Sequence, residues 1–312
     1  MSQHLEKTGT RDAGPHFAAR NEHLIGSSSY VPRFGTSSES KLTHRTTDNV
    51  VTDSQYSLPR ILGIWAAAAI PMALLAWVAT PLVGDRLDLG VGDANREAFT
   101  RAGFIMIGMI WQFVLAMIII RQDEGHLSWS TIRRRCWLNA PRDPHTGESR
   151  SKLWWWLAPL IVAVVATQFI PLQLVWEAAF PFLEEPDKYS FAELLGSDER
   201  KASLEGAWQV VGLFVVMGIF NTVLGEEFLF RGVLLPKMNG VFGKRDWIAN
   251  GLLFGLYHLH QPWSIFSSMV RGVFLYAWPT RRFHSAWMGI VIHSMQTVFF
   301  IFVALGLVLG FA

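Results

Sequence analysis

Residues 208–231 read WQVVGLFVVMGIFNTVLGEEFLFR, an apolar run that leads directly into two glutamates and an arginine. An apolar helix of roughly 20 residues crosses the hydrocarbon core of a bilayer at about 1.5 Å per residue. Ionisable side chains are costly inside a membrane, so Glu226, Glu227 and Arg231 are candidates for function. The stretch therefore predicts a membrane helix that carries a reactive polar site.

The composition of the whole chain favours a membrane protein. Of its 312 residues, 51% are hydrophobic and 17% are charged, whereas soluble domains carry about 25% charged residues. The net charge of +2 creates no strong field of the kind that nucleic-acid-binding proteins show, so no nucleic-acid partner is expected. The single cysteine, Cys136, excludes an internal disulfide framework.

Further apolar runs lie on both sides of this stretch, separated by polar loops. We expect membrane helices over residues 61–83, 103–120, 153–175, 208–224, 247–260, 264–278 and 285–311. The last run is too long for one upright helix, so it forms either one tilted helix or two short ones broken near Gly306. The predicted fold class is all-α, a polytopic transmembrane bundle of about seven to eight helices.

The chain divides into three predicted parts. Residues 1–57 are rich in Ser, Thr, His and charge, and they cannot bury enough apolar surface to offset the cost of ordering, so we expect a disordered polar tail. Residues 58–204 are expected to hold the N-terminal transmembrane helices and loops. Residues 205–312 are expected to form the catalytic membrane domain.

Loop charges predict the orientation in the membrane. Basic residues concentrate in the connection 121–152 and again at 237–245 and 281–282, whereas the connection between Glu177 and Glu199 is rich in acidic residues. Cytoplasmic loops carry the excess of Lys and Arg, so we expect the N-terminus and the basic loops on the cytoplasmic side, in the plasma membrane. We also expect the site to open toward the cytoplasmic leaflet, where the 232–246 loop lies.

The adjacent carboxylates Glu226 and Glu227 suit general-base chemistry. They repel each other and face desolvation at the end of an apolar helix, and both effects favour a base that works near neutral pH. Glu227 and Arg231 are four residues apart, so they share a helix face and can form an ion pair. Glu226 lies about 100° round the helix and is free to activate water. A solvated helix end with a surface salt bridge would explain the same residues.

Two histidines complete the candidate site. His258 follows Phe254 by four residues on the same helix face, and His293 lies deep in the last apolar run, where it needs a partner. Thr297 is one turn beyond His293, whereas His260 points nearly opposite to His258 and receives no role. A carboxylate base with two imidazoles resembles a hydrolase site, in which the histidines orient water, stabilise an oxyanion or bind a metal.

In this order, these residues resemble the motifs of the CPBP family, also called ABI or CAAX prenyl protease 2-like. The family motifs are Glu-Glu-x-x-x-Arg, Phe-x-x-x-His and His-x-x-x-Asn, and the chain reads Glu226-Glu227-x-x-x-Arg231, Phe254-x-x-x-His258 and His293-x-x-x-Thr297. The resemblance covers residues 205–300. It implies an intramembrane endopeptidase, of the glutamate type or a metalloendopeptidase, whose type II CAAX members act on prenylated C-terminal tripeptides.

The resemblance also implies a role for each matching residue. Glu226 would activate water with help from His258, Glu227 with Arg231 would hold the site, and His293 would stabilise the oxyanion. Phe254 and Thr297 would support the site. A divalent metal such as Zn²⁺ is a candidate cofactor, with Glu226, His258 and His293 as its ligands. Thr297 stands where the family has Asn, and losing such a donor costs on the order of 10²–10³ in rate.

Two other functions compete with the peptidase. One is a catalytically inactive membrane scaffold or immunity protein of the same fold, for which the Thr297 departure is the support. The other is a transporter in which buried His and Glu side chains relay protons; the lack of an internal repeat counts against it. For the peptidase, the expected partners are membrane lipid and a membrane-associated peptide or protein substrate, including one of the CAAX-type prenylated class.

Overall fold

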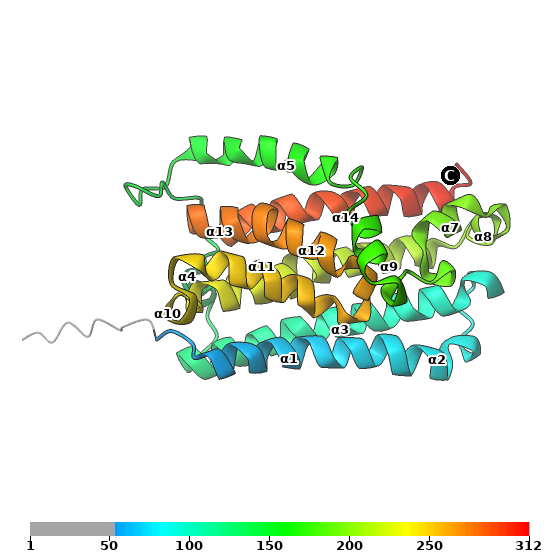
Figure 1. Cartoon of the computed structure of the whole chain (residues 1–312), viewed down its shortest axis with the longest axis horizontal. Helices are drawn as coiled ribbons and strands as arrows, with labels where there is room; N and C mark the ends of the chain where they lie inside the picture. The colour runs from blue at the N-terminus through cyan, green and yellow to red at the C-terminus, as the bar shows by residue number, and fades with distance from the viewer. Residues whose placement is uncertain (1–53, 312) are drawn as a thin grey trace, which may run out of the picture. The chain divides into compact units, whose positions relative to one another are not determined.

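The computed structural model describes residues 54–311, in which the long helices run side by side along a common axis (Figure 1). Within this range the β-structure is limited to an isolated bridge between Arg142 and Ser149. The predicted all-α class is therefore confirmed. The predicted disordered tail lies outside the described residues except for positions 54–57, which lead into the first helix.

Four helices are long and apolar enough to cross a membrane: Leu58–Val83, Asp93–Glu124, Trp208–Lys237 and Ala286–Val308. The first comprises α1 (Leu58–Leu74) and α2 (Thr80–Val83), the second is α3 (Asp93–Glu124), the third begins as α9 (Trp208–Gly218), and the fourth is α14 (Ala286–Val308). The predicted polytopic bundle is thus confirmed, whereas the predicted seven to eight spanning helices are confirmed in part. The last apolar run forms one continuous helix and is not broken near Gly306 into two short ones.

The run 153–175 does not form one membrane helix, so that prediction is wrong. A 3₁₀ turn over Ser151–Trp156 leads into α5 (Leu157–Ala166), the chain then leaves the helix, and α6 (Leu172–Ala179) follows. The Thr167 hydroxyl donates to the Val164 carbonyl oxygen at 2.7 Å. Pro171 lacks a backbone N–H and disfavours a helical conformation at Ile170. The Thr167 hydrogen bond and Pro171 therefore accompany a break in a segment that would be expected to cross the membrane from its hydropathy alone.

The fifth and sixth apolar runs form a helical hairpin. Its first arm is α11 (Asp246–Tyr257), and its second arm contains α12 (Ile265–Arg271) and α13 (Trp278–Phe283). Two glycines of α11 let the arms approach closely. A Cβ on Gly251 would lie 2.4 Å from the Val273 nitrogen, and one on Gly255 would lie 2.8 Å from Met269 Cα. Backbone atoms cannot move aside as a flexible side chain can, so both positions require glycine.

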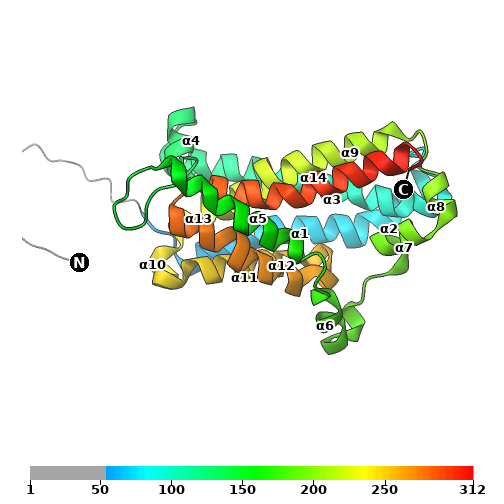
Figure 2. The ribbon, with the colours of Figure 1, turned by 90° about the horizontal axis from the view of Figure 1, so that it is seen from above.

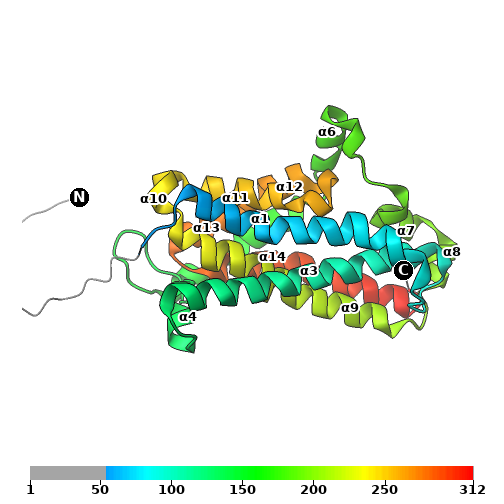
Figure 3. The same ribbon diagram turned by 90° about the horizontal axis from the view of Figure 1, so that it is seen from below.

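The bundle has two ends that differ in the elements they carry (Figures 2 and 3). The first, here called the α10 end, holds the start of α1 and the two helices α4 (Trp129–Arg135) and α10 (Asn239–Phe242). The second, here called the α8 end, holds α2 and the short helices α7 (Phe191–Gly196) and α8 (Asp198–Ala202). The continuous run Phe228–Leu235 is buried in the core on the α10 side of the two glutamates.

The hairpin contact yields a prediction about stability. We expect Gly251→Ala to lower the free energy of unfolding by about 1–3 kcal/mol, because the new methyl group meets the opposite backbone. The measurement is thermal unfolding of the purified protein in detergent. Gly63→Ala in α1 is the matched control, since a Cβ there meets nothing within 4 Å. Equal unfolding temperatures for the two variants would contradict the close packing of the hairpin.

Candidate functional site

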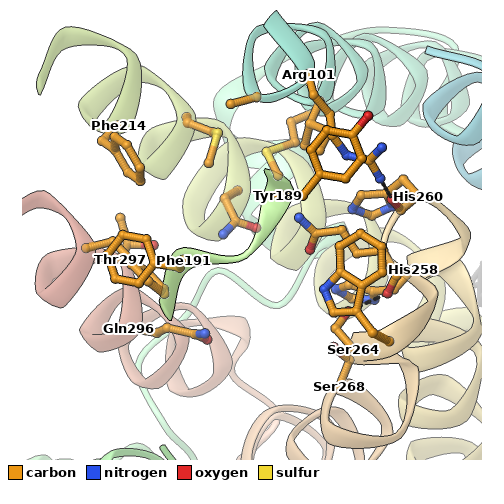
Figure 4. A pocket seen from close by; sticks show the side chains of 18 of the residues that line it. Arg101, Tyr189, Phe191, Phe214, His258, His260, Ser264, Ser268, Gln296 and Thr297 are labelled. Atoms are coloured by element: carbon orange, nitrogen blue, oxygen red, sulfur yellow. Dashed lines mark hydrogen bonds between the residues drawn. The ribbon is translucent and has the colours of Figure 1, made fainter. Parts of the chain in front are cut away.

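A cavity of about 360 Å³ lies among α3, α9, α12 and α14, and the three sequence motifs meet at it. Its lining includes five of the predicted site residues: Glu226, Phe254, His258, His293 and Thr297. Figure 4 shows His258 and Thr297 on opposite walls of the cavity. The other two, Glu227 and Arg231, are buried behind the wall. Residues from separate helices are therefore brought together as the sequence predicts.

Glu227 is the centre of a buried network. Its Oε1 lies 3.2 Å from Arg231 Nη1, and His293 Nδ1 lies 3.0 Å from the same oxygen. Arg231 also donates to the Gly272 carbonyl oxygen at 3.2 Å. The predicted pair between Glu227 and Arg231 is thus present, and it is fully buried rather than a solvated surface salt bridge.

Glu226 points into the cavity, away from that ion pair. The Tyr257 hydroxyl lies near its carboxylate. Gln112 of α3 donates in turn to the Tyr257 hydroxyl at 2.5 Å. Gln112 thus orients the Tyr257 hydroxyl, which is the polar group beside the Glu226 carboxylate. Sequence reasoning missed Tyr257, although it directly precedes His258.

Phe254 and its carbonyl oxygen organise the two histidines. His258 Nδ1 lies 2.9 Å from the Phe254 oxygen, so its Nδ1 carries the proton that is shared with this carbonyl. The Phe254 ring contacts the His258 ring at 5.0 Å and the His293 ring at 6.1 Å between centroids. The Arg231 guanidinium lies 4.0 Å from the Phe254 ring centre. Phe254 thus holds both imidazoles against the ion pair.

The Nδ1 contacts define what each histidine offers to the cavity. With Nδ1 bound to the Phe254 carbonyl oxygen, neutral His258 presents an unprotonated Nε2 that accepts a hydrogen bond. With Nδ1 bound to the Glu227 carboxylate, His293 donates from Nε2 only in its imidazolium form. The Tyr276 ring stacks on His293 at 4.5 Å and fixes the plane of the imidazole.

The third motif departs from the family pattern at Thr297, and the structure shows what surrounds it. Thr297 and its neighbour Gln296 both line the cavity, and Figure 4 shows their side chains on the same wall. The Thr297 methyl group packs on Gly218 of α9, where an added Cβ would lie 2.2 Å from it. Gln296 lies about 100° round the helix from Thr297. It still lines the cavity, because the cavity contacts more than one face of α14.

The glutamate pair lies between two π-helical turns, Ile219–Gly225 and Phe228–Leu234. Such turns are frequent at functional sites, where an extra residue in the turn redirects side chains. Gly225 permits the close approach of α3, since a Cβ there would lie 2.9 Å from the Met109 carbonyl oxygen. The local backbone therefore brings Glu226 against α3 and the cavity.

His260 lies in the site, although sequence reasoning gave it no role. Its ring stacks on His258 with centroids 5.3 Å apart, and it lines the same cavity. Its carbonyl oxygen accepts from the buried guanidinium of Arg101. The chain leaves α11 at Tyr257 and continues as a 3₁₀ turn, so residues 258 and 260 do not point in opposite directions as in an α-helix.

The cavity extends toward the α8 end of the bundle. Tyr189, Phe191 and Arg200, from the connection between α6 and α9, line it there. Tyr189 donates to Glu97 at 2.6 Å, which ties this connection to α3. Burial raises the pKa of the Glu185 carboxyl at the same place. Toward the α10 end, by contrast, the residues that follow Glu226 are buried in the core.

No residue of the 232–246 loop is among those that line the cavity, so an opening at this loop stays a prediction that the lining does not support. The loop follows the buried run Phe228–Leu235, which closes that side of the site. Residues of the acidic connection line the cavity on the other side, toward the α8 end. The cytoplasmic orientation of the basic loops stays a prediction from their charge.

The predicted metal ligands do not form a ready metal site. Among residues 54–311, no group of three His, Cys, Asp or Glu side chains lies close enough together to hold a metal ion. His258 and His293 each have Nδ1 engaged, which leaves one ring nitrogen on each side of the cavity. A zinc site formed by Glu226, His258 and His293 therefore stays a prediction. The side-chain arrangement in this structure does not fit a bound zinc ion.

Comparison with known proteins supports one family. Residues 207–299 match the family model described as type II CAAX prenyl endopeptidase Rce1-like. The match covers all three motifs and the cavity walls that α9, α11, α12 and α14 supply. Neither the curated proteins nor the solved structures gave a match.

The direction of the cavity can be tested by cysteine labelling, because the native Cys136 is silent. It is buried, and burial raises the pKa of its thiol to about 12, so it stays protonated and unreactive at pH 7–8. In sealed vesicles we expect a membrane-impermeant maleimide to label Gln296→Cys from the same face as Glu199→Cys in α8. Lys244→Cys, at the α10 end, should react only from the opposite face. Labelling of Gln296→Cys from the Lys244 face would contradict the assigned opening.

The buried ion pair yields a second prediction for the site. Arg231→Met leaves the Glu227 carboxylate buried without its cation, so we expect a loss of about 3–5 kcal/mol in unfolding free energy. Glu227→Gln combined with Arg231→Met removes both charges and should recover most of that loss. Denaturant unfolding in detergent measures both variants. A double variant no more stable than Arg231→Met would show that the charge imbalance is not the cause.

Proposed function

We propose that this chain, whose residues 207–299 belong to the Rce1-like family of type II CAAX prenyl endopeptidases, hydrolyses a peptide bond of a membrane-associated substrate. The observation that carries the proposal is the convergence of Glu226, His258 and His293 on one cavity within the membrane bundle. A carboxylate and two imidazoles that face a common space are what hydrolysis by an activated water requires. A scaffold that had lost the chemistry would not need to keep them.

In the proposed reaction, Glu226 is the general base. It removes a proton from water, and the oxygen attacks the carbonyl carbon of the scissile bond. The unprotonated Nε2 of His258 accepts a hydrogen bond from the other O–H group of the water and holds the water in line for attack. When the tetrahedral intermediate collapses, the C–N bond breaks and Glu226 returns its proton to the leaving amine. Tyr257 keeps the carboxylate in one orientation throughout.

His293 is the proposed donor to the oxyanion. Since its Nδ1 faces Glu227, this role uses the imidazolium form, in which Nε2 also carries a proton. The Glu227 carboxylate stabilises that cation, as the acidic partner of a hydrolase histidine does. Gln296 supplies a second N–H donor on the same wall, which compensates for Thr297 in place of Asn.

The cavity also suits a substrate that carries an apolar chain. One part of its lining is apolar and comes from α3, α9 and α14, formed by Phe99, Ile105, Met109, Phe214, Met217 and Phe300. The polar part holds Glu226 and the histidines. An amphiphilic substrate such as a prenylated peptide fits both parts, because its lipid replaces water against the apolar wall.

The proposal predicts cleavage by the purified protein in liposomes. We expect a farnesylated CAAX-type peptide to be cut, and Glu226→Gln to reduce kcat by at least about 10²-fold, because general-base catalysis contributes about 10²–10⁴. His258→Ala and His293→Ala should each reduce kcat by about 10²-fold. Product formation is followed by mass spectrometry, and Arg245→Gln, an exposed change at the α10 end, is the control.

The same assay separates the alternatives. Cleavage that is unaffected by Glu226→Gln would refute the assigned base. If the wild type cleaves nothing and Thr297→Asn restores activity, the chain is an inactive member of the fold whose role is binding. Loss of activity with a chelator, followed by recovery with Zn²⁺, would support the predicted metal.

A further inference from the structure

The buried ion pair uses only one oxygen of the Glu227 carboxylate. Arg231 Nη1 and His293 Nδ1 both meet Oε1, at 3.2 and 3.0 Å. The other oxygen, Oε2, is buried and has no hydrogen-bond partner among the described residues. A buried carboxylate oxygen without a donor costs free energy, because folding has removed the water that solvated it. Oε2 therefore needs a donor that the three motifs do not supply.

Thr280 of α13 carries a hydroxyl at the right place. A Cβ built on Gly289 would lie 2.7 Å from Glu227 Oε2 and 2.9 Å from Thr280 Oγ1, so both oxygens border one small space beside α14. Thr280 is fully buried, and within residues 54–311 its hydroxyl also has no hydrogen-bond partner. The third atom at this space is the Tyr276 carbonyl oxygen, at 3.3 Å, which can only accept. Thr280 is thus the donor among the three.

The hydrogen of the Thr280 hydroxyl is not used within its own helix. A Thr or Ser in a helix often donates to the carbonyl oxygen one turn back. Thr222, in the turn before the glutamates, does so to Gly218 at 3.0 Å. Thr280 has Tyr276 one turn back, but it makes no such bond in the described part of the chain. Its hydrogen is therefore available to Glu227.

A contact at Oε2 would control the contact between Glu227 and His293. His293 lies one helical turn beyond Gly289 on α14, and Thr280 lies on α13, directly before that helix. Held at Oε1 alone, the carboxylate can turn about its Cγ–Cδ bond and move away from His293. Held at both oxygens, it stays in one plane and keeps Oε1 against His293 Nδ1.

We propose that Thr280 is a positioning residue, whose hydroxyl donates to Glu227 Oε2 and thereby holds Oε1 against His293. This inference rests on the proposed peptidase function, in which the Glu227 carboxylate stabilises the imidazolium of His293. Thr280 is not among the residues that line the cavity, so it acts through Glu227 and touches no substrate. A hydrogen bond to an ionised carboxylate is stronger than one between neutral groups.

The kinetic test replaces Thr280 by Val, which removes the hydroxyl and keeps the branched shape. With a farnesylated CAAX-type peptide in liposomes, we expect Thr280→Val to lower kcat by about 10- to 100-fold, as loss of one hydrogen bond to a charged group implies. KM should stay within about twofold. Thr280→Ser keeps the hydroxyl and should retain most of the kcat. Thr100→Val is the matched control, because Thr100 is also buried with an unpartnered hydroxyl and is not among the residues that line the cavity.

Unfolding in detergent tests the same contact without turnover. In the wild-type background, we expect Thr280→Val to shift the unfolding equilibrium constant by about tenfold. In the Glu227→Leu/Arg231→Met background, the same change should shift it by less than about twofold, because the acceptor is gone. An equal shift in both backgrounds would overturn the proposal, since the hydroxyl would then act on a group other than Glu227.

The two measurements separate this inference from the peptidase function. Cleavage by the wild type with an unchanged kcat in Thr280→Val would keep the peptidase and overturn the role of Thr280. A kcat in Thr280→Ser as low as that in Thr280→Val would also overturn it, because the loss would then come from packing. Coupling between Thr280 and Glu227 in unfolding, without cleavage of any peptide, would keep the contact and refute the peptidase.

Discussion

The buried carboxylate of Glu227 is the constraint on which the site depends. Taking a charge out of water costs several kcal/mol unless partners replace the lost solvation. Here Arg231 lies on the same helix, His293 comes from α14, and Arg231 reaches on to the Gly272 carbonyl oxygen of the hairpin. Both partners meet Glu227 Oε1, so pairing this one oxygen links three elements that carry the site.

The same constraint separates the roles of the two glutamates. Because Glu227 is turned toward Arg231 and His293, the adjacent Glu226 faces the cavity, where Tyr257 lies near its carboxylate. Gly289 is the counterpart of this arrangement on α14. A Cβ there would lie 2.7 Å from Glu227 Oε2, so a larger residue would push the helix away from the carboxylate. The Glu-Glu-x-x-x-Arg motif thus depends on Gly289, a small residue that is not part of any of the three motifs.

The sequence predicts those parts of the site that follow from one helix at a time. Spacing along a helix is enough to pair Glu227 with Arg231 and to place Phe254 beside His258. Spacing along a helix does not identify Tyr257, because its partner Gln112 lies on a helix that is far away in the sequence. It also fails for His260, because the 3₁₀ turn after Tyr257 changes the angle between successive side chains. Tertiary contacts and local helix type, rather than composition, decide these residues.

The opening of the cavity shows a second limit of sequence reasoning, and a physical one. Loop charge predicts which side of a membrane a loop occupies, but it carries no information about which end of a bundle is filled by side chains. At the α10 end the core residues of Phe228–Leu235 fill the space completely, whereas at the α8 end the covering connection contributes Tyr189 and Phe191 over an unfilled volume. In the proposed reaction, water and the polar end of a substrate would approach from the side of this acidic connection. The apolar wall that α3, α9 and α14 supply suits an apolar chain on the proposed substrate. For the proposed function, the packing around the glutamates and the lining of the cavity thus limit the approach and the chemistry of a substrate, whereas loop charge does not.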